Sequence, residues 1–160
     1  MQIKWIFLGL VLTVFPAIAQ AVPSGGEYYG YWSEPESMDY ISLGNGSFEI
    51  SGKYVAVMTY EEVPGQGKHA LIGEIFDCAE QQFALSEKVD YDADNHEITS
   101  NSSKNIMNCF GQIEEDTRQE FLLIGICDEA NGKPLAVAKV RDYFKMIATS
   151  LEASDRLLRR

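Results

Sequence analysis

The chain has 160 residues and a formal net charge of −11, from 24 Asp and Glu against 13 Lys and Arg. Its length fits one domain of ordinary size. The excess of negative charge argues against a nucleic-acid-binding protein, which needs basic side chains to neutralise phosphates. It also argues against adsorption on an anionic membrane surface.

Residues 1–21 have the features of a secretory signal peptide. Lys4 supplies a positive charge, and an uncharged, mostly apolar segment covers 5–15. Small residues after a proline then allow cleavage after Ala19 or Ala21. The alternative is an uncleaved anchor helix, but eleven residues are short of the roughly 20 that a bilayer span needs. We therefore expect no transmembrane span after cleavage, and a protein that is periplasmic, secreted or associated with the cell surface.

Strand-forming residues dominate the next part of the chain. The predicted strands cover 27–32, 40–43, 48–50, 53–61, 71–78, 82–91 and 96–99. Asn45-Gly46 between apolar residues is a strong hairpin signal, so we expect a hairpin there. Four apolar residues alternate with polar ones and predict a half-solvated antiparallel strand with one core face: Phe83, Leu85, Val89 and Tyr91.

The pattern changes after residue 100. Residues 100–108 are polar and predicted as a loop. Asp116 or Thr117 is the expected cap of a helix, because Thr117 and Glu120 have the spacing of a capping box. Pro134 suits the first position of a second helix. The apolar residues of that helix recur at steps of three and four: Val137, Val140, Phe144, Ile147 and Leu151.

Strands followed by helices predict an α+β fold, in which an antiparallel sheet carries the C-terminal helix or helices on one face. We expect a single domain over residues 22–160. It should be mainly β over about 27–99 and mainly α over about 116–158.

Export would place Cys78, Cys109 and Cys127 in an oxidising compartment, where cysteines pair. Three cysteines allow three single bridges, each of which leaves one free thiol. A bridge between Cys78, at a predicted strand end, and Cys127, at a predicted helix end, would tie helix to sheet. The alternative is a redox or nucleophilic thiol, but the chain has no CxxC motif.

Two further groups of residues are candidate sites. Tyr28, Tyr29, Tyr31 and Trp32 form the best candidate binding patch, because such aromatics dominate interface hot spots; packing in the core is the simpler alternative. Asp90, Asp92 and Asp94 resemble the start of a calcium loop. The later positions of that loop lack its Gly and Glu, so a solvated acidic turn is the preferred interpretation. No other metal and no cofactor is predicted.

Residues 53–58, followed by 74–79 and 83–85, resemble the surface-adhesin protein E family of small exported bacterial proteins. The resemblance covers about residues 50–127. It implies an antiparallel sheet with a helix tethered to its concave face by a disulfide, here Cys78–Cys127, with Cys109 as an additional thiol. The chain lacks the lipid-anchor cysteine of some adhesin members, and it continues for 33 residues past Cys127.

The resulting hypothesis is an exported bacterial, non-catalytic binding module, whose partner would be an extracellular or periplasmic protein and not a nucleic acid. One alternative is a periplasmic enzyme or enzyme inhibitor. A hydrolase would need a nucleophile–base pair, for which His69 and His96 are the imidazole candidates. Another alternative is a structural protein stabilised by Ca²⁺ at the acidic turn. The oligomeric state is left open.

Overall fold

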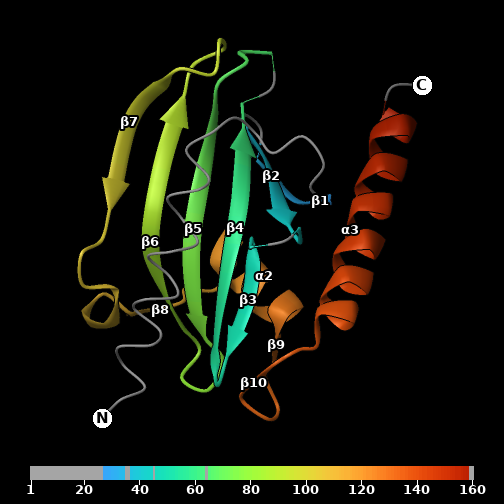
Figure 1. Cartoon of the computed structure of the whole chain (residues 1–160). Coiled ribbons are helices and arrows are strands. Elements are labelled where there is room, and N and C mark those ends of the chain that lie inside the picture. The colour runs from blue at the N-terminus through green and yellow to red at the C-terminus, as the bar shows by residue number, and fades with distance from the viewer. Residues whose placement is uncertain (1–26, 35–36, 45, 64, 159–160) are drawn as a thin grey trace.

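The computed structural model describes residues 27–34, 37–44, 46–63 and 65–158, so the predicted signal peptide at 1–21 lies outside the described residues. Antiparallel strands build one eight-stranded sheet, whose main path runs β1-β2-β4-β5-β6-β7 (Figure 1). β3 pairs with β4, and β8 pairs with β6. The strands are β1 (Tyr28–Glu34), β2 (Ser37–Ser42), β3 (Phe48–Ser51), β4 (Tyr54–Glu62), β5 (His69–Asp77), β6 (Gln82–Tyr91), β7 (Glu97–Ser102) and β8 (Gly111–Gln112).

Within the described residues, two α-helices accompany the sheet, and Figure 1 shows α2 behind the central strands and α3 along the side where β1 lies. The remaining elements are η2 (Ile106–Asn108), α2 (Arg118–Ile126), β9 (Cys127–Asp128), β10 (Lys133–Pro134) and α3 (Val137–Leu158). The predicted α+β class, an antiparallel sheet with C-terminal helices packed on it, is confirmed. Within the described ranges, no helix is long and apolar enough to cross a bilayer.

The main core lies between the sheet and the two helices, on the side that we call the helix face. Its buried residues are Tyr31, Ile41, Leu43, Val55, Val57, Phe76, Cys78, Leu122, Leu123, Ile126, Cys127, Val140 and Phe144. Gly125 brings α2 close to α3, because a Cβ at this position would lie 2.5 Å from the ring of Phe144. The opposite side, the outer face, holds two smaller clusters, centred on Ile75 and on Leu71.

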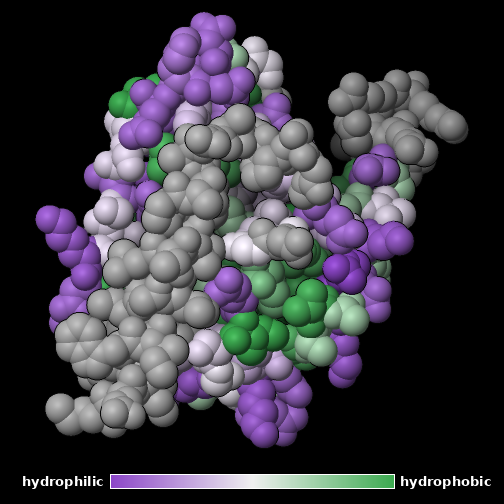
Figure 2. Space-filling view, viewed as in Figure 1, coloured by the Kyte–Doolittle hydropathy of each residue, from purple (hydrophilic) through white to green (hydrophobic). Residues whose placement is uncertain are grey.

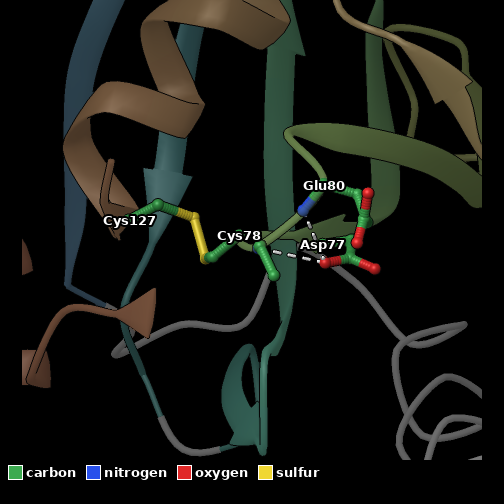
Figure 3. Close-up of a disulfide and its surroundings, with 5 residues drawn as sticks. Asp77, Cys78, Glu80 and Cys127 are labelled. Atoms are coloured by element: carbon green, nitrogen blue, oxygen red, sulfur yellow. Dashed lines mark hydrogen bonds between the residues drawn. A yellow bond between two sulfur atoms is a disulfide. The ribbon is translucent and has the colours of Figure 1, made fainter. Parts of the chain in front are cut away.

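A disulfide joins Cys78, just after β5, to Cys127, at the C-terminal end of α2 (Figure 3). The two Cα atoms are 5.5 Å apart, although 49 positions separate the residues in sequence. Asp77 shapes the turn beside it, since its Oδ1 accepts hydrogen bonds from the backbone N–H groups of Ala79 and Glu80 at 3.0 and 3.1 Å. The disulfide therefore ties helix to sheet, as the resemblance implied.

A β-bulge at Ser86 divides β6 between the two faces. The register with β5 shifts at this residue, which is left without a partner in the ladder. Before it, Phe83 stacks on Phe76 in the main core; after it, Val89 and Tyr91 pack in the cluster on the outer face. The prediction of one core face for the alternating apolar residues was therefore wrong, because an inserted residue reverses the alternation beyond it.

The segment around Asn45-Gly46 does not connect paired strands. β2 and β3 both pair with β4, one after the other along its edge. The tight hairpin instead joins β3 to β4 through Gly52-Lys53, where Gly52 has a φ of 63°. The predicted hairpin was wrong because β4, with nine residues, is long enough to pair with both shorter strands.

Two further boundaries differ from the sequence-based expectation. Pro134 pairs with Cys127 in the β9–β10 ladder, and α3 begins only at Val137. Proline is tolerated there because a two-residue edge strand loses little when one backbone donor is missing. The segment predicted as a loop contains the end of β7, up to Ser102, and the single turn η2.

Some hydrophobic side chains remain at the surface. Figure 2 shows them gathered below the centre of this view, in the part of the molecule where Figure 1 shows β3 and the start of α3. Ile50 of β3 and Val137 of α3 are among the exposed large hydrophobic residues. Isolated apolar residues at a surface are common, so this area carries no site by itself.

Candidate functional site

The N-terminal end of α2 is held by side chains that were predicted from the sequence. Thr117 is the N-cap, and its Oγ1 accepts a hydrogen bond from the backbone N–H of Glu120 at 3.3 Å. Glu120 in turn accepts, through Oε2, from the backbone N–H of Asp116 at 2.7 Å. This reciprocal pair satisfies free donors of the first turn. It makes Arg118 the first residue of the helix.

Arg118 reaches Glu74, in the middle of β5 on the helix face. Its Nη1 and Nη2 donate to Oε1 and Oε2 of Glu74, each at 3.0 Å, which is the two-pronged geometry that suits guanidinium and carboxylate. Nη2 also donates to Oγ1 of Thr59. Gln119 Nε2 donates to Glu74 Oε1 at 3.2 Å. Glu74 is 1% exposed, so its charge is balanced almost entirely by protein groups.

Asp39 of β2 approaches the same guanidinium but is less well satisfied. Its Oδ2 lies 3.4 Å from Arg118 Nε, and its Oδ1 has no hydrogen-bond partner in the described part of the protein. Burial raises the pKa of Asp39 to about 6, although the positive charge of Arg118 acts in the opposite direction. Asp39 is 3% exposed. It is therefore a buried carboxylate with one unpaired oxygen.

The same surroundings affect Arg118 and Tyr31. Burial acts to lower the pKa of Arg118, but Glu74, Tyr31 and Asp39 raise it overall, so the guanidinium stays charged. Burial raises the pKa of Tyr31 well above its usual value, which keeps the hydroxyl protonated. That hydroxyl also has no hydrogen-bond partner within the described residues. We call Arg118 and the side chains around it, Glu74, Asp39 and Tyr31, the Arg118 centre. It combines the Arg118–Glu74 ion pair with buried polar atoms that make no hydrogen bond among the described residues.

A cleft of about 420 Å³ lies beside this centre. Four carboxylates line it: Glu34, Asp39, Glu61 and Glu74. The cationic lining residues are Arg118 and Lys88, and the Nζ of Lys88 is 3.5 Å from Oε2 of Glu61. Ile72, Phe83 and Leu85 supply apolar walls from β5 and β6. Most of these residues belong to strands and to the first turn of α2, which gives the cleft a rigid frame.

The four aromatic residues of the predicted binding patch do not share one surface. Tyr31 is buried between Phe121 and Phe144 in the main core, with 2% exposure. Tyr29 and Trp32 pack partly against that core on the helix face. Tyr28 lies on the outer face, where its ring contacts Tyr60. Strand alternation separates Tyr28 from Tyr29, and the bulge at Tyr31 shifts the register with β2 so that Trp32 lies on the same face as Tyr29. A role for these residues in binding stays a prediction.

The outer face carries a row of aromatic rings that crosses the sheet. The ring of His69 stacks between Tyr60 and Tyr91, with centroids 5.2 and 4.9 Å apart. Tyr40 continues the row on the side of Tyr60. In the parts of the chain that are described, no Ser, Thr or Cys side chain hydrogen-bonds to His69 or His96, so the structure brings no nucleophile to either imidazole.

The acidic turn between β6 and β7 gathers two of the three predicted residues, with His96 in place of Asp90. Asp92, Asp94 and His96 place ligand atoms within 4.8 Å of one another, whereas Asp90 turns away and accepts a hydrogen bond from Thr99. Oδ1 of Asp92 already accepts backbone hydrogen bonds from Asp94 and His96, both at 2.9 Å. These bonds lower the pKa of Asp92, and they are those of an ordinary tight turn.

Cys109 is exposed and unpaired. Its Sγ contacts Ser103 Oγ and the carbonyl oxygen of Asn105, each at 3.4 Å. These contacts lie within one short loop segment and involve no cationic group. Cys109 is thus an unpaired thiol, as the resemblance implied, and it does not line the cleft.

Sequence reasoning did not single out the residues of the Arg118 centre. A signal for one of them was present, because Glu74 interrupts an otherwise apolar strand and alternates with Ile72 and Phe76 on the buried side. A carboxylate at such a position needs a cationic or hydrogen-bonding partner. No local pattern pointed to Arg118 as that partner, since it lies 44 positions further along the chain.

No protein-family model matches the chain, and neither a curated protein nor a solved structure matches it. The likeness to the surface-adhesin protein E family therefore stays a prediction. Evidence on function therefore comes from two features of the structure: the helix that Cys78–Cys127 joins to the sheet, and the cleft beside Asp39 and Arg118.

Proposed function

We propose that the protein is an exported bacterial, non-catalytic binding module, similar in role to surface-adhesin protein E-like proteins, which holds part of a partner in the cleft beside Arg118. The observation that carries the proposal is Asp39. This carboxylate is buried in the wall of the cleft with one oxygen unpaired, next to a rigid Arg118–Glu74 pair. A buried acceptor without a hydrogen bond is uncommon in folded proteins, and carboxylates with perturbed surroundings in a cleft are candidates for functional sites.

Two features support export. The first 21 residues have the charge, apolar segment and small residues of a signal peptide. The bridge between Cys78 and Cys127 suits an oxidising compartment, because cytosolic thiols are kept reduced. The partner would then be a periplasmic or extracellular protein.

The size and frame of the cleft support binding. A volume of about 420 Å³ falls within the range of small-molecule and side-chain pockets, roughly 300–1,000 Å³. The lining residues come from β1, β2, β4, β5, β6 and the start of α2. Sites on such elements hold their side chains more firmly than sites on loops. The four carboxylates in its wall also give the cleft a negative charge that can select a ligand.

A periplasmic enzyme is the alternative, and one observation favours it. The pKa of Asp39 is raised to about 6, which is within the range useful for a general acid or base. Against it, neither His69 nor His96 is paired with a hydroxyl or thiol among the residues described. Binding requires only the groups that the cleft contains, whereas a reaction would need a second catalytic group near Asp39.

The experiment is selection from a random-peptide display library on the purified exported protein. Selected peptides should bind the native protein and lose binding to Leu85→Arg, which places a long side chain in the cleft. Ile124→Arg is the matched control, because Ile124 is 44% exposed on α2 and Leu85 is 42% exposed in the cleft wall. Equal binding to both variants, or a selection that enriches no peptide, would refute a binding function of this cleft.

A further inference from the structure

We infer that the cleft beside Asp39 accepts a cationic side chain, lysine or arginine, of the partner protein. This inference rests on the proposed function and makes it more specific, because it names the chemistry of the group that enters. The argument uses three properties of the cleft: the balance of its charges, the unpaired oxygen of Asp39, and its apolar walls.

The charges of the lining are negative in sum, with four carboxylates against two cations. Both cations already have anionic partners. Arg118 is held by both oxygens of Glu74, and Lys88 lies 3.5 Å from Glu61 and 3.6 Å from Asp90. An anionic group would meet net repulsion here, whereas a cation would be attracted.

Asp39 provides an independent reason for a ligand. Its side chain is 4% exposed, its Oδ1 has no hydrogen-bond partner within the described ranges, and the residue lines the cleft. A buried acceptor without a donor is costly, and a charged acceptor is more so. Arg118 does not relieve this, since its Nη atoms are committed to Glu74 and Thr59, and its Nε lies 3.4 Å from the other oxygen, Oδ2, without a hydrogen bond among the described residues. A donor from outside the chain would complete the site, and a cationic N–H group is the strongest such donor.

The apolar walls suit the stem of a long cationic side chain. Ile72, Phe83 and Leu85 lie in the same cleft as the carboxylates, and Leu85 is 42% exposed. Lysine and arginine bury their methylene groups along such surfaces while the charged end reaches polar groups. A cleft with carboxylates beside aliphatic and aromatic walls therefore fits an alkyl chain that ends in a cation.

A metal ion fits the cleft less well. Among the described residues, the group of three or more ligand side chains with atoms within 4.8 Å of one another is Asp92, Asp94 and His96, on a different turn. The cleft carboxylates are not drawn together in this way. Divalent cations such as Ca²⁺ need six to eight oxygen ligands in one shell. The carboxylates of the cleft do not form such a shell, and a cationic side chain needs only one or two of them as hydrogen-bond acceptors.

The test is an NMR titration of the isotope-labelled protein with peptides taken from the selection described above. For each peptide, the residue that enters the cleft is varied among Lys, Arg, Gln and Glu. 1,4-Diaminobutane is titrated separately, to distinguish a free amine from a side chain of a peptide. The variants are Asp39→Asn and Glu61→Gln, with Glu129→Gln as control, because Glu129 is exposed and outside the cleft and its replacement changes the net charge equally.

Lys and Arg peptides should shift the amide signals of Leu85 and Gln119 and bind at least about tenfold more tightly than the Gln peptide, as for a charged hydrogen bond. Asp39→Asn should remove most of that preference, and Glu61→Gln should weaken binding by about twofold to fivefold. Glu129→Gln should leave it unchanged. Since Glu61 is only partly buried, its variant remains informative if Asp39→Asn alters the fold.

Other outcomes separate this inference from the proposed function. Peptides that bind in the cleft with equal affinity for Gln and Lys, or with a preference for Glu, would overturn the inference and leave the binding function standing. A diamine that binds as tightly as the Lys peptide would assign the cleft to small amines and overturn the assignment to a partner protein. Peptides that do not perturb the cleft residues would refute both.

Discussion

Arg118 and Glu74 are 44 positions apart in sequence, yet two hydrogen bonds of 3.0 Å join their charged groups beneath the first turn of α2. Glu74 is almost fully buried, and 15% of the Arg118 side chain is exposed. This pair fixes the orientation of α2 on the sheet at the helix end opposite to the disulfide. The helix is thereby held at both ends, by a charge pair at the start and by Cys127 at the finish.

Removing one partner of this pair should be strongly destabilising. Arg118→Met leaves the charge of Glu74 buried without a counterion, and we expect a loss of about 3–5 kcal/mol in the free energy of unfolding. The double variant Arg118→Met with Glu74→Met should recover part of this loss, because Glu74 no longer buries a charge, whereas Asp39 still loses the cation beside it. Urea unfolding followed by circular dichroism measures both. Lys139→Met on the exposed side of α3 is the control and should change stability by less than about 0.5 kcal/mol.

The disulfide should contribute through the loop that it closes. Its sequence separation of 49 residues predicts a stabilisation of about 4 kcal/mol in the chain-entropy model. The double variant Cys78→Ala with Cys127→Ala should show that loss, whereas Cys109→Ala should have little effect because Cys109 is exposed and unpaired. Non-reducing peptide mapping by mass spectrometry should find the same bridge in the exported protein and a new N-terminus at Gln20 or Val22. Three free thiols, or a retained N-terminus, would contradict the assignment.

Asp39 should make stability depend on pH in an unusual direction. Its pKa is about 6 in the fold, against about 3.9 in an unfolded chain. Between these values the folded protein binds the proton more tightly, so the contribution of Asp39 to stability is highest below about pH 4. That contribution falls as the pH rises to about 6.

The corresponding experiment compares Asp39→Asn with the native protein at pH 4 and at pH 7.5. Relative to the native protein, the variant should gain about 2 kcal/mol in free energy of unfolding over this interval, because it has no carboxylate to ionise. Asp142→Asn, on the exposed side of α3, is the control and should give a much smaller difference. A variant that instead loses stability as the pH rises would show that the charged form of Asp39 is favoured in the fold.

Gly125 should not tolerate a side chain. A Cβ at this position would lie 2.5 Å from the ring of Phe144 and 2.8 Å from that of Tyr143, so α2 and α3 would have to separate. We expect Gly125→Ala to lower the free energy of unfolding by about 2 kcal/mol, although alanine favours a helix by about 1 kcal/mol over glycine. Gly111→Ala, where a Cβ meets nothing within 4 Å, is the matched control for thermal denaturation. A rise in melting temperature for Gly125→Ala would contradict the close packing of the helices.

Local chemistry allowed several features to be predicted from the sequence. The cap at Thr117 follows from side chains within four residues of one another, and the strand–helix order follows from the change of hydrophobic period. The bulges at Tyr31 and Ser86 left no comparable signal. A bulge reverses the faces of all later residues in a strand, so the apolar residues of β6 do not share one core face, whereas in β1 the bulge turns Trp32 to the face of Tyr29.

The sequence by itself thus determined the fold class and the start of α2; it left three cysteine pairings open, and the resemblance implied the Cys78–Cys127 bridge that the structure contains. The fold class and the helix start depend on residues that are near neighbours or on patterns that repeat along one element. The tertiary structure decided the pairing of β3, the faces of β6, and the meeting of Arg118, Glu74 and Asp39 at the cleft. Contacts between distant segments depend on strand register and helix placement, which arise only when all elements compete for the same core and the same hydrogen-bond partners.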